Sequence, residues 1–206
     1  MHITTLTLPN GALVGWAEPT LDAVERVAAL NRLSALERGR AAAMPQVAQD
    51  SFLVGRVLLR EIASVVARAP ADSMVVSARC PDCGGAHGAP VIEGATVSVS
   101  LARCATAVVV AASGTGRIGV DVEQRDGTAD DRLSAIETLT GERSLRRWTR
   151  TEAVLKADGR GLRIDPADVA FDSDSASLRG SSQRYRVYEP ELIPGIQVSV
   201  AWAVNA

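Results

Sequence analysis

Aromatic residues are scarce in this chain of 206 residues, of which Phe, Trp and Tyr make up 3%. A hydrophobic core must therefore be aliphatic and draw on the Val, Leu, Ile and Ala within an apolar fraction of 47%. No stretch approaches the roughly 20 consecutive apolar residues that a membrane-spanning helix requires. The N-terminal sequence MHITTLTLPNGALVGW also lacks the charged and apolar regions of a secretory signal. These absences favour a globular protein without a membrane partner.

Cysteine and net charge are equally limited. Three cysteines, an odd number in a chain of this length, do not suit a disulfide scaffold and fit a reducing compartment, so we expect the cytoplasm. The formal net charge of −2 argues against a broad electrostatic surface for nucleic acid. A local basic pocket stays open, because arginine dominates the cationic residues. We expect a monomer that binds no nucleic acid.

Hydrophobic periodicity predicts an order of helices, strands, helices and strands. Helices are expected over 21–32 with Thr20 as the cap, after the capping-box residues Ser34 and Glu37, and over 46–67, 130–139 and 142–157, the last ended by Gly159 and Gly161. Strands are expected over 74–78, 96–102, 106–112, 117–123, 169–171, 185–189 and 196–204. This order predicts an α+β fold of two halves, residues 1–113 and 114–206, that divide at a turn.

Two carboxylates lie in the expected strand 117–123. Side chains alternate between the faces of a strand, so Val120 and Val122 would point to the core. Asp121 and Glu123 would then share the other face, where they repel each other unless a cation sits between them. Magnesium, which takes one or two carboxylates plus phosphate oxygens, is the natural partner. An isolated D-x-E is nevertheless more often a solvated strand face.

Glu152 and Lys156 lie four residues apart, and so on one face, in the expected helix 142–157. Their spacing allows two interpretations. The pair could be an ion pair that stabilises the helix by about 0.3 kcal/mol. Alternatively, Glu152 could be a third metal ligand or a general base, and Lys156 could contact phosphate.

Together, these two motifs resemble those of the surfactin-synthetase-activating type of 4′-phosphopantetheinyl transferase. That family carries a strand G-[IV]-D-x-E and, some tens of residues later, W-[ST]-x-x-E-[AS]-x-x-K. This chain supplies GVDVE at 119–123 and WTRTEAVLK at 148–156, and the following GRGL at 159–162 is also similar. The resemblance spans roughly residues 52–162. The pair of motifs at this separation is far more specific than either motif alone.

Three upstream segments resemble the parts of the family that bind coenzyme A. FLVGRVLLR at 52–60 resembles the helix that offers an arginine to the 3′-phosphate, and Arg56 is the closer match. A guanidinium suits this role because its planar fork binds phosphate oxygens bidentately. Arg60 is expected to lie on a solvated helix face. HGAP, beginning at His87, resembles the loop H/K-G-K-P that grips the nucleotide, and SLARC, which contains Arg103, resembles S-x-S-H-S/C.

Four positions depart from the family pattern, and together they weaken the cationic side of the pocket that would bind phosphate. Ala89 stands in place of a basic residue, and Arg103 in place of the histidine. Ala102 replaces a small hydroxyl residue, and Thr151 replaces the common lysine before the glutamate. Arginine keeps a positive donor near a pyrophosphate but cannot lose its proton, so it cannot act as a base.

The resemblance implies a pseudo-twofold pair of similar α+β halves, the 4′-phosphopantetheinyl transferase fold, with the active site in the cleft between them. It implies transfer of the phosphopantetheine arm of coenzyme A to a serine of an acyl or peptidyl carrier protein, with release of 3′,5′-adenosine bisphosphate. Magnesium would be held by Asp121, Glu123 and Glu152. Glu152 would also take the serine proton, and Lys156 would stabilise the transferring phosphoryl group. Coenzyme A would be contacted by Arg56, His87, Arg103 and Lys156.

Two alternatives remain open at this stage. A degenerate homologue could bind coenzyme A or a carrier protein without catalysis, as the departures at Ala89, Arg103 and Thr151 allow. Cys80, Cys83 and His87 could hold zinc in an interaction module, although a structural zinc site normally closes with four ligands. A Ser-His-Asp hydrolase is disfavoured because the chain contains no G-x-S-x-G elbow.

Overall fold

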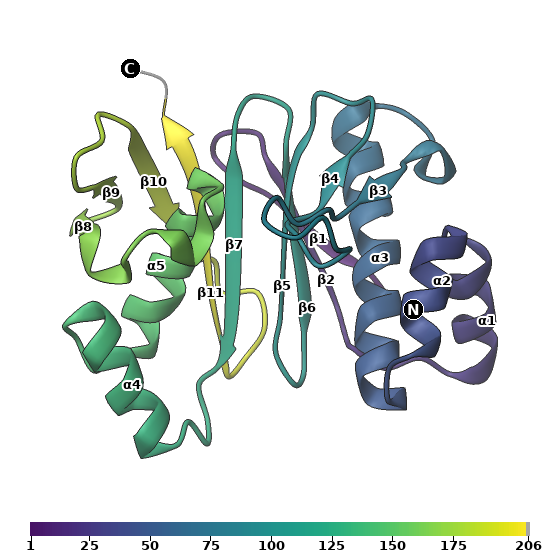
Figure 1. Cartoon of the computed structure of the whole chain (residues 1–206), viewed down its shortest axis with the longest axis horizontal. Helices are drawn as coiled ribbons and strands as arrows, with labels where there is room; N and C mark the ends of the chain where they lie inside the picture. The colour runs from purple at the N-terminus through teal and green to yellow at the C-terminus, as the bar shows by residue number, and fades with distance from the viewer. Residues whose placement is uncertain (205–206) are drawn as a thin grey trace. The chain divides into compact units, whose positions relative to one another are not determined.

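The computed structural model describes residues 1–204, which contain five α-helices and three antiparallel sheets (Figure 1). The chain is therefore mixed α+β, as expected. It forms two compact units, Met1–Gly114 and Thr115–Ala206, so the boundary lies one residue from the predicted position. Residues 205–206 of the predicted second half lie outside the described residues. Within 1–204, none of the helices has the length and apolarity of a membrane span.

The elements of each unit have the following bounds. The helices are α1 Ala23–Asn31, α2 Ala35–Ala42, α3 Gln46–Ala67, α4 Asp130–Thr140 and α5 Leu145–Asp158. The strands of the first unit are β1 Thr4–Thr7, β2 Leu13–Ala17, β3 Val76–Ser77, β4 Val91–Ile92, β5 Ser98–Arg103 and β6 Val108–Ser113. Those of the second unit are β7 Ile118–Gln124, β8 Val169–Asp172, β9 Ser175–Leu178, β10 Arg184–Tyr188 and β11 Ile196–Val204.

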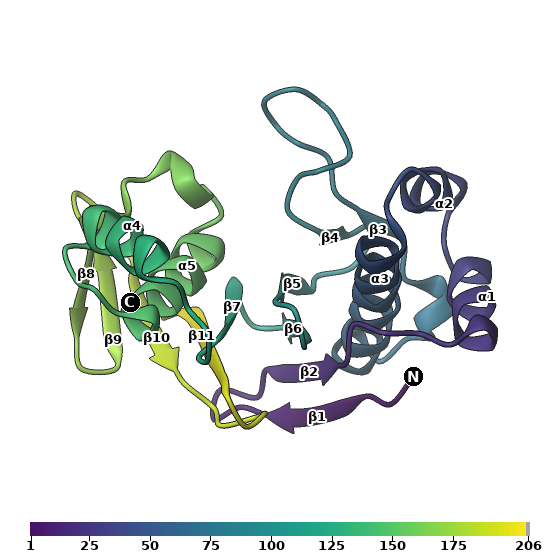
Figure 2. The ribbon, with the colours of Figure 1, turned by 90° about the horizontal axis from the view of Figure 1, so that it is seen from below.

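In the first unit, the long helix α3 packs on a four-stranded sheet of order β1-β2-β6-β5. Its apolar residues recur at helical spacing, so Phe52, Leu58 and Ile62 enter one aliphatic core with residues of β6. Helices α1 and α2 contact α3 from the side opposite the sheet (Figure 2). The predicted bounds of α3 are confirmed.

Local sequence determines where the short helices of the first unit begin. Ser34 caps α2 in a complete capping box with Glu37, as predicted. The predicted cap of α1 at Thr20 is wrong, because Asp22 makes its own capping box with Glu25 and starts that helix later.

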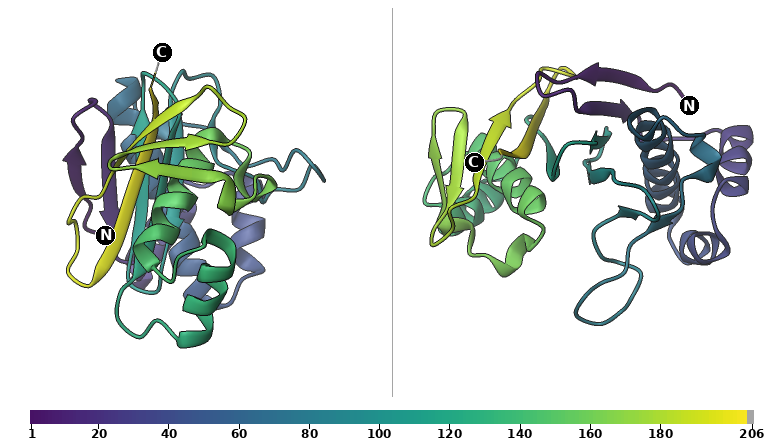
Figure 3. Two further views of the ribbon diagram at one scale, coloured as in Figure 1. Left: turned by 90° about the vertical axis from the view of Figure 1, so that its left-hand side faces the viewer. Right: turned by 90° about the horizontal axis from the view of Figure 1, so that it is seen from above.

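In the second unit, α5 packs on β7 and β11 of a five-stranded sheet of order β7-β11-β10-β9-β8. Helix α4 packs against α5 on the same face of this sheet (Figure 3). Gly159 ends α5 with φ of 92°, as predicted, but Gly161 opens a separate 3-10 turn and does not cap the helix. Strand β9 was not predicted, because its sequence SASL carries little hydrophobic signal.

Gly119 allows α5 to lie directly against β7. A Cβ atom at this position would lie 2.1 Å from the Ala153 carbonyl oxygen and 2.5 Å from the Ala157 amide nitrogen. Both contacts are with helix backbone, which cannot move aside as a side chain can. The glycine that opens the GVDVE motif therefore has a packing role.

We predict that Gly119→Ala lowers the free energy of unfolding by about 2–3 kcal/mol, because the added methyl group overpacks the α5–β7 contact. Gly116→Ala is the matched control, since a Cβ there meets nothing within 4 Å and should change stability by less than about 0.5 kcal/mol. Denaturant unfolding followed by circular dichroism measures both. Equal stability of the two variants would contradict this account of the packing.

Candidate functional site

The acidic residues of the two motifs come together in the second unit, where α5 covers one face of β7. Gly119, Asp121 and Glu123 share that face. Ser199 pairs with Asp121 across the β7–β11 ladder, and its hydroxyl lies 2.9 Å from that of Thr149 on α5. The expected solvated strand face is thus covered by the helix that carries Glu152 and Lys156.

Lys156 occupies the space between the carboxylates. Its ammonium nitrogen lies 2.6 Å from Asp121 Oδ1 and 4.0 Å from Glu152 Oε2. It also donates to the Val120 carbonyl oxygen at 3.2 Å. The tight partner of Lys156 is therefore Asp121 on the strand. The helical pair with Glu152, which spacing alone suggested, is the looser of the two.

Asp121 is the most buried of the three carboxylates, with 7% of the residue exposed. Its Oδ2 atom is buried and has no hydrogen-bond partner among the described residues. Burial raises the pKa of Asp121, although the Lys156 charge opposes the shift. A buried, partly unpaired carboxylate costs stability, so it indicates a group that binds a further partner.

The pKa values of Glu123 and Glu152 are raised for the same reason. Burial is the main cause in both cases, and the negative charge of Asp121 adds to it. Arg132 on α4 opposes the shift at Glu123 through an ion pair with that carboxylate. Arg132 was missed by sequence reasoning, because only the packing of α4 on α5 brings it to β7.

These carboxylates suit a hard divalent cation such as magnesium, and the unpaired Asp121 Oδ2 supplies a free ligand atom. Their oxygens are nevertheless spread apart. A close group of metal ligands has three or more acidic, cysteine or histidine side chains whose ligand atoms all lie within 4.8 Å of one another. Within residues 1–204, Cys80, Cys83 and His87 form such a group, and the acidic residues do not. Lys156 pairs with Asp121 and Arg132 with Glu123, so a metal ion would compete with these two cations for the carboxylates.

An arginine-rich pocket of about 490 Å³ lies in the first unit. This volume falls in the range of small-molecule sites. Its basic lining residues are Arg32, Arg40, Arg56, Arg60 and Arg79, and its acidic ones are Glu37, Asp72 and Glu93. Of the arginines, Arg40 and Arg79 form no ion pair with a carboxylate in the described part of the chain. The pocket therefore keeps positive charge for an anion.

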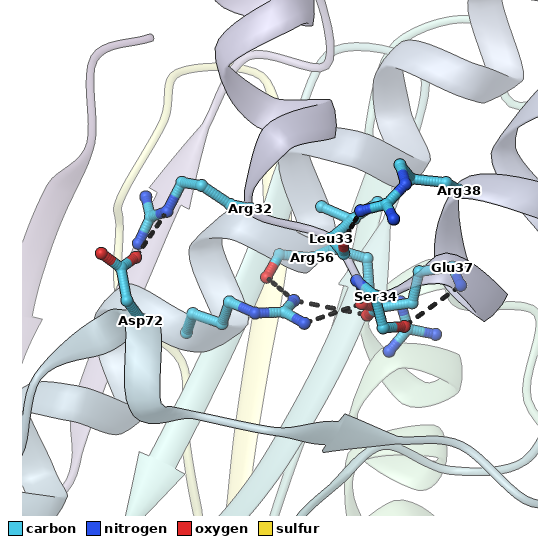
Figure 4. A network of polar contacts seen from close by, with 8 residues as sticks. Arg32, Leu33, Ser34, Glu37, Arg38, Arg56 and Asp72 are labelled. Atoms are coloured by element: carbon cyan, nitrogen blue, oxygen red, sulfur yellow. Dashed lines mark hydrogen bonds and ion pairs between the residues drawn. The ribbon is translucent and has the colours of Figure 1, made fainter.

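Glu37 lines the pocket and joins a polar network, in which its amide donates to Ser34 Oγ (Figure 4). Its carboxylate lies 2.7 Å from Arg60 Nη2 and 3.6 Å from Arg56 Nε. Arg60 is buried, so its expected solvated position is wrong: the ion pair with Glu37 draws it into the unit. Burial lowers the pKa of Arg56 to about 10, and the nearby charges of Arg40 and Arg103 act in the same direction. Glu37 was not singled out by sequence, where it read only as a helix cap.

Besides Lys156, the three basic residues expected to bind coenzyme A are placed differently from one another. Arg56 lines the pocket and lies over the Phe52 ring at 5.0 Å from its centroid. Arg103 is outside the lining but close enough for its charge to act on Arg56. His87 also lies outside the lining, and its Nε2 is 2.9 Å from Cys83 Sγ. Thr151 is fully buried on α5 and donates to the Arg147 carbonyl oxygen at 2.9 Å.

We predict that Glu37→Gln costs about 3 kcal/mol of unfolding free energy at pH 7, because it leaves Arg60 buried without its counter-ion while glutamine keeps the capping box. Burial acts to raise the pKa of Glu37, but the Arg60 and Ser34 hydrogen bonds hold it below its usual value. Glu37 therefore contributes its full stabilisation above about pH 4.3, its pKa in the unfolded chain. This stabilisation is lost as the pH falls through the lower pKa of Glu37 in the folded chain. The stability difference between wild type and variant should shrink in that acid range.

Glu61→Gln is the control for this prediction. Glu61 pairs with Arg32 at 2.7 Å, but its side chain is 37% exposed, so its loss should cost less than about 1 kcal/mol. Chemical denaturation at pH 7 and at pH 3.5 separates the two cases. A Glu37→Gln cost that does not change between the two pH values would contradict the assignment.

Comparison with known proteins adds no family to these observations. No protein-family model matches the chain, and no curated protein gives a significant match. The function is accordingly argued from three features of the molecule. They are the paired motifs at 119–123 and 148–156, the buried carboxylates with Lys156, and the arginine-rich pocket.

Proposed function

We propose that the protein is a magnesium-dependent 4′-phosphopantetheinyl transferase. It moves the phosphopantetheine arm of coenzyme A to the hydroxyl of a carrier-protein serine and releases 3′,5′-adenosine bisphosphate. The observation that carries this proposal is the buried Asp121 carboxylate, whose Oδ2 has no hydrogen-bond partner while its Oδ1 contacts Lys156. The resemblance of the two motifs to the transferase family supplies the reaction.

Glu152 is the proposed general base. It lies on α5 one helical turn before Lys156, and burial raises its pKa toward neutrality. A carboxylate whose pKa is nearer the working pH accepts a proton more readily. Glu152 would take the proton of the serine hydroxyl as the serine oxygen forms a bond to the phosphorus. The bond from that phosphorus to the oxygen of the adenosine bisphosphate breaks in the same transfer.

Lys156 is the proposed cation for the transferring phosphoryl group. Two hydrogen bonds, to Asp121 and to the Val120 carbonyl oxygen, fix its ammonium group at the carboxylates. A preorganised positive charge stabilises the charge that develops in the transition state without a cost of reorganisation. Thr151, at the family's lysine position, is uncharged, and its hydroxyl donates to the Arg147 carbonyl oxygen.

Asp121, Glu123 and Glu152 would hold the magnesium ion, which when bound neutralises charge on the pyrophosphate oxygens. Lys156 and Arg132, which pair with Asp121 and Glu123, would share these carboxylates with the metal.

The nucleotide end of coenzyme A is assigned to the first unit. Arg56, Arg40 and Arg79 give its pocket an excess of positive charge over the paired Glu37. Arg56 would bind the 3′-phosphate, as the resemblance implies. Arg103 lies beside Arg56 and can add to the field that attracts phosphate, whereas His87 is engaged with Cys83.

The finer fold assignment is also part of the proposal. Each unit packs one long helix, α3 or α5, on an antiparallel sheet. This shared arrangement supports the inference that the two halves are similar in fold, as in the transferase family.

Glu152→Gln should lower the rate of transfer by roughly 10²–10⁴-fold, because the base is lost while the size of the side chain is kept. The protein is mixed with coenzyme A, magnesium and several carrier proteins, and the gain of the phosphopantetheine mass is followed by intact-mass spectrometry. Glu142→Gln, at an exposed position before α5, should transfer at the wild-type rate. Equal rates for both variants would remove Glu152 from the mechanism.

The same assay separates an enzyme from a degenerate homologue. Magnesium-dependent binding of coenzyme A by the wild-type protein, without transfer to any carrier that a control enzyme modifies, would contradict the proposed activity. That result would favour a binding protein instead.

Arg56→Lys should weaken binding of coenzyme A by about 10-fold and leave binding of 3′-dephospho-coenzyme A nearly unchanged, because only the former carries the phosphate that the guanidinium fork holds. Isothermal titration calorimetry with each ligand gives the ratio of the affinity for coenzyme A to that for 3′-dephospho-coenzyme A. A loss of stability would affect both ligands alike, so the ratio reports the phosphate contact alone. An equal loss for the two ligands would place the 3′-phosphate elsewhere.

A further inference from the structure

The loop between β3 and β4 brings three metal-ligating side chains together. Cys80 Sγ, Cys83 Sγ and a ring nitrogen of His87 all lie within 4.8 Å of one another. The closest pair is Cys83 Sγ and His87 Nε2, at 2.9 Å. Figure 2 shows this loop as a long excursion away from α3. Both cysteines are free thiols, so no disulfide accounts for their proximity.

The backbone of the loop is folded around the two sulfur atoms. The Gly84 amide donates to the Cys80 carbonyl oxygen at 2.9 Å, and the Cys80 amide donates to the Gly85 carbonyl oxygen at 2.7 Å. The Gly85 amide donates to Cys83 Sγ at 3.4 Å. A donor directed at a sulfur atom helps to hold that atom in the orientation a metal ligand needs.

Glycines make this tight turn possible. Gly84 has φ of 73°, a conformation that other residues rarely adopt. A Cβ at Gly88 would lie 2.4 Å from the Arg79 carbonyl oxygen, so only glycine lets the chain return to β4 at this point. Gly84 and Gly88 therefore set the close geometry of this loop.

We propose that this loop binds one zinc ion through the thiolates of Cys80 and Cys83 and the Nε2 atom of His87. Two thiolates and an imidazole favour zinc over a hard cation such as magnesium. Zinc would separate Cys83 Sγ and His87 Nε2 to about 3.5 Å, given Zn–S and Zn–N bonds of about 2.3 and 2.0 Å in a tetrahedron. Cys83 and His87 are exposed, so water completes the fourth position. The nearby Asp82 carboxylate, 3.8 Å from Cys80 Sγ, adds favourable negative charge.

The effect on coenzyme A rests on the proposed function. Gly84 and Ala86 of this loop line the arginine-rich pocket, and Arg40 donates a hydrogen bond to the Ala86 carbonyl oxygen. Zinc would fix the pocket wall by closing the loop on both sides of Ala86. His87 is thereby a metal ligand, and its effect on coenzyme A passes through the shape of the wall.

The test measures metal in the full chain, purified without a histidine tag and under reducing conditions. Elemental analysis should find about one zinc ion per wild-type chain. Cobalt added to the zinc-free protein should give a thiolate-to-cobalt charge-transfer band. Because losing an outer-shell partner alone costs about 10–100-fold in metal affinity, Cys83→Ser should lose more than about 100-fold. Cys104→Ser, which changes the cysteine outside the loop, should keep the wild-type metal content and band.

Absence of both zinc and the cobalt band in the wild-type protein would overturn the proposal, and so would wild-type affinity in Cys83→Ser. Cobalt titration of the wild type decides the question even if the variant does not fold. Removal of zinc by a chelator should weaken 3′,5′-adenosine bisphosphate binding by about 10-fold, and unchanged affinity would overturn the effect on the pocket wall. Bound zinc in a protein without transferase activity would overturn only the proposed function. Transfer by a wild-type protein that contains no zinc and gives no cobalt band would overturn only the zinc site.

Discussion

The acidic site depends on the direct contact of α5 with β7. Gly119 has no side chain, so the backbone of α5 at Ala153 and Ala157 lies against the strand. That approach places Lys156 and Glu152, from successive turns of the helix, over Asp121, two residues further along the strand. A side chain at Gly119 would separate the two elements and open the Lys156–Asp121 contact. The motif residues therefore act as one packed unit, in which glycine sets the distance and the charged residues supply the chemistry.

The charges of the two units are arranged in opposite ways. In the second unit, one buried and two half-buried carboxylates have raised pKa values, and a lysine partly balances their charge. In the first unit, the single buried glutamate Glu37 forms ion pairs with Arg56 and Arg60, and further arginines line the same pocket. A bound cation would offset the negative charge of the second unit's carboxylates, and a bound phosphate would offset the positive charge of the first unit's arginines.

Much of this arrangement could be predicted from the sequence, and the failures have a common physical cause. Periodicity located α3 and β11 with their observed bounds, and the spacing of Glu152 and Lys156 correctly placed them on one helix face. Spacing did not reveal that Lys156 would prefer Asp121, because that contact depends on how α5 packs across the sheet. Arg132 and Glu37 were missed for the same reason. Their partners lie on other elements, and no local pattern marks such a pair.

On the proposed function, the acidic site of α5 and β7 binds a divalent metal together with coenzyme A. Electron paramagnetic resonance of manganese, which resembles magnesium in its preference for oxygen ligands, tests it most directly. Coenzyme A and wild-type protein together should remove the free-manganese signal, and Asp121→Asn should restore that signal while the protein stays folded. A wild-type protein that leaves the free-manganese signal unchanged, or an Asp121→Asn variant that binds manganese as tightly as wild type, would contradict the account.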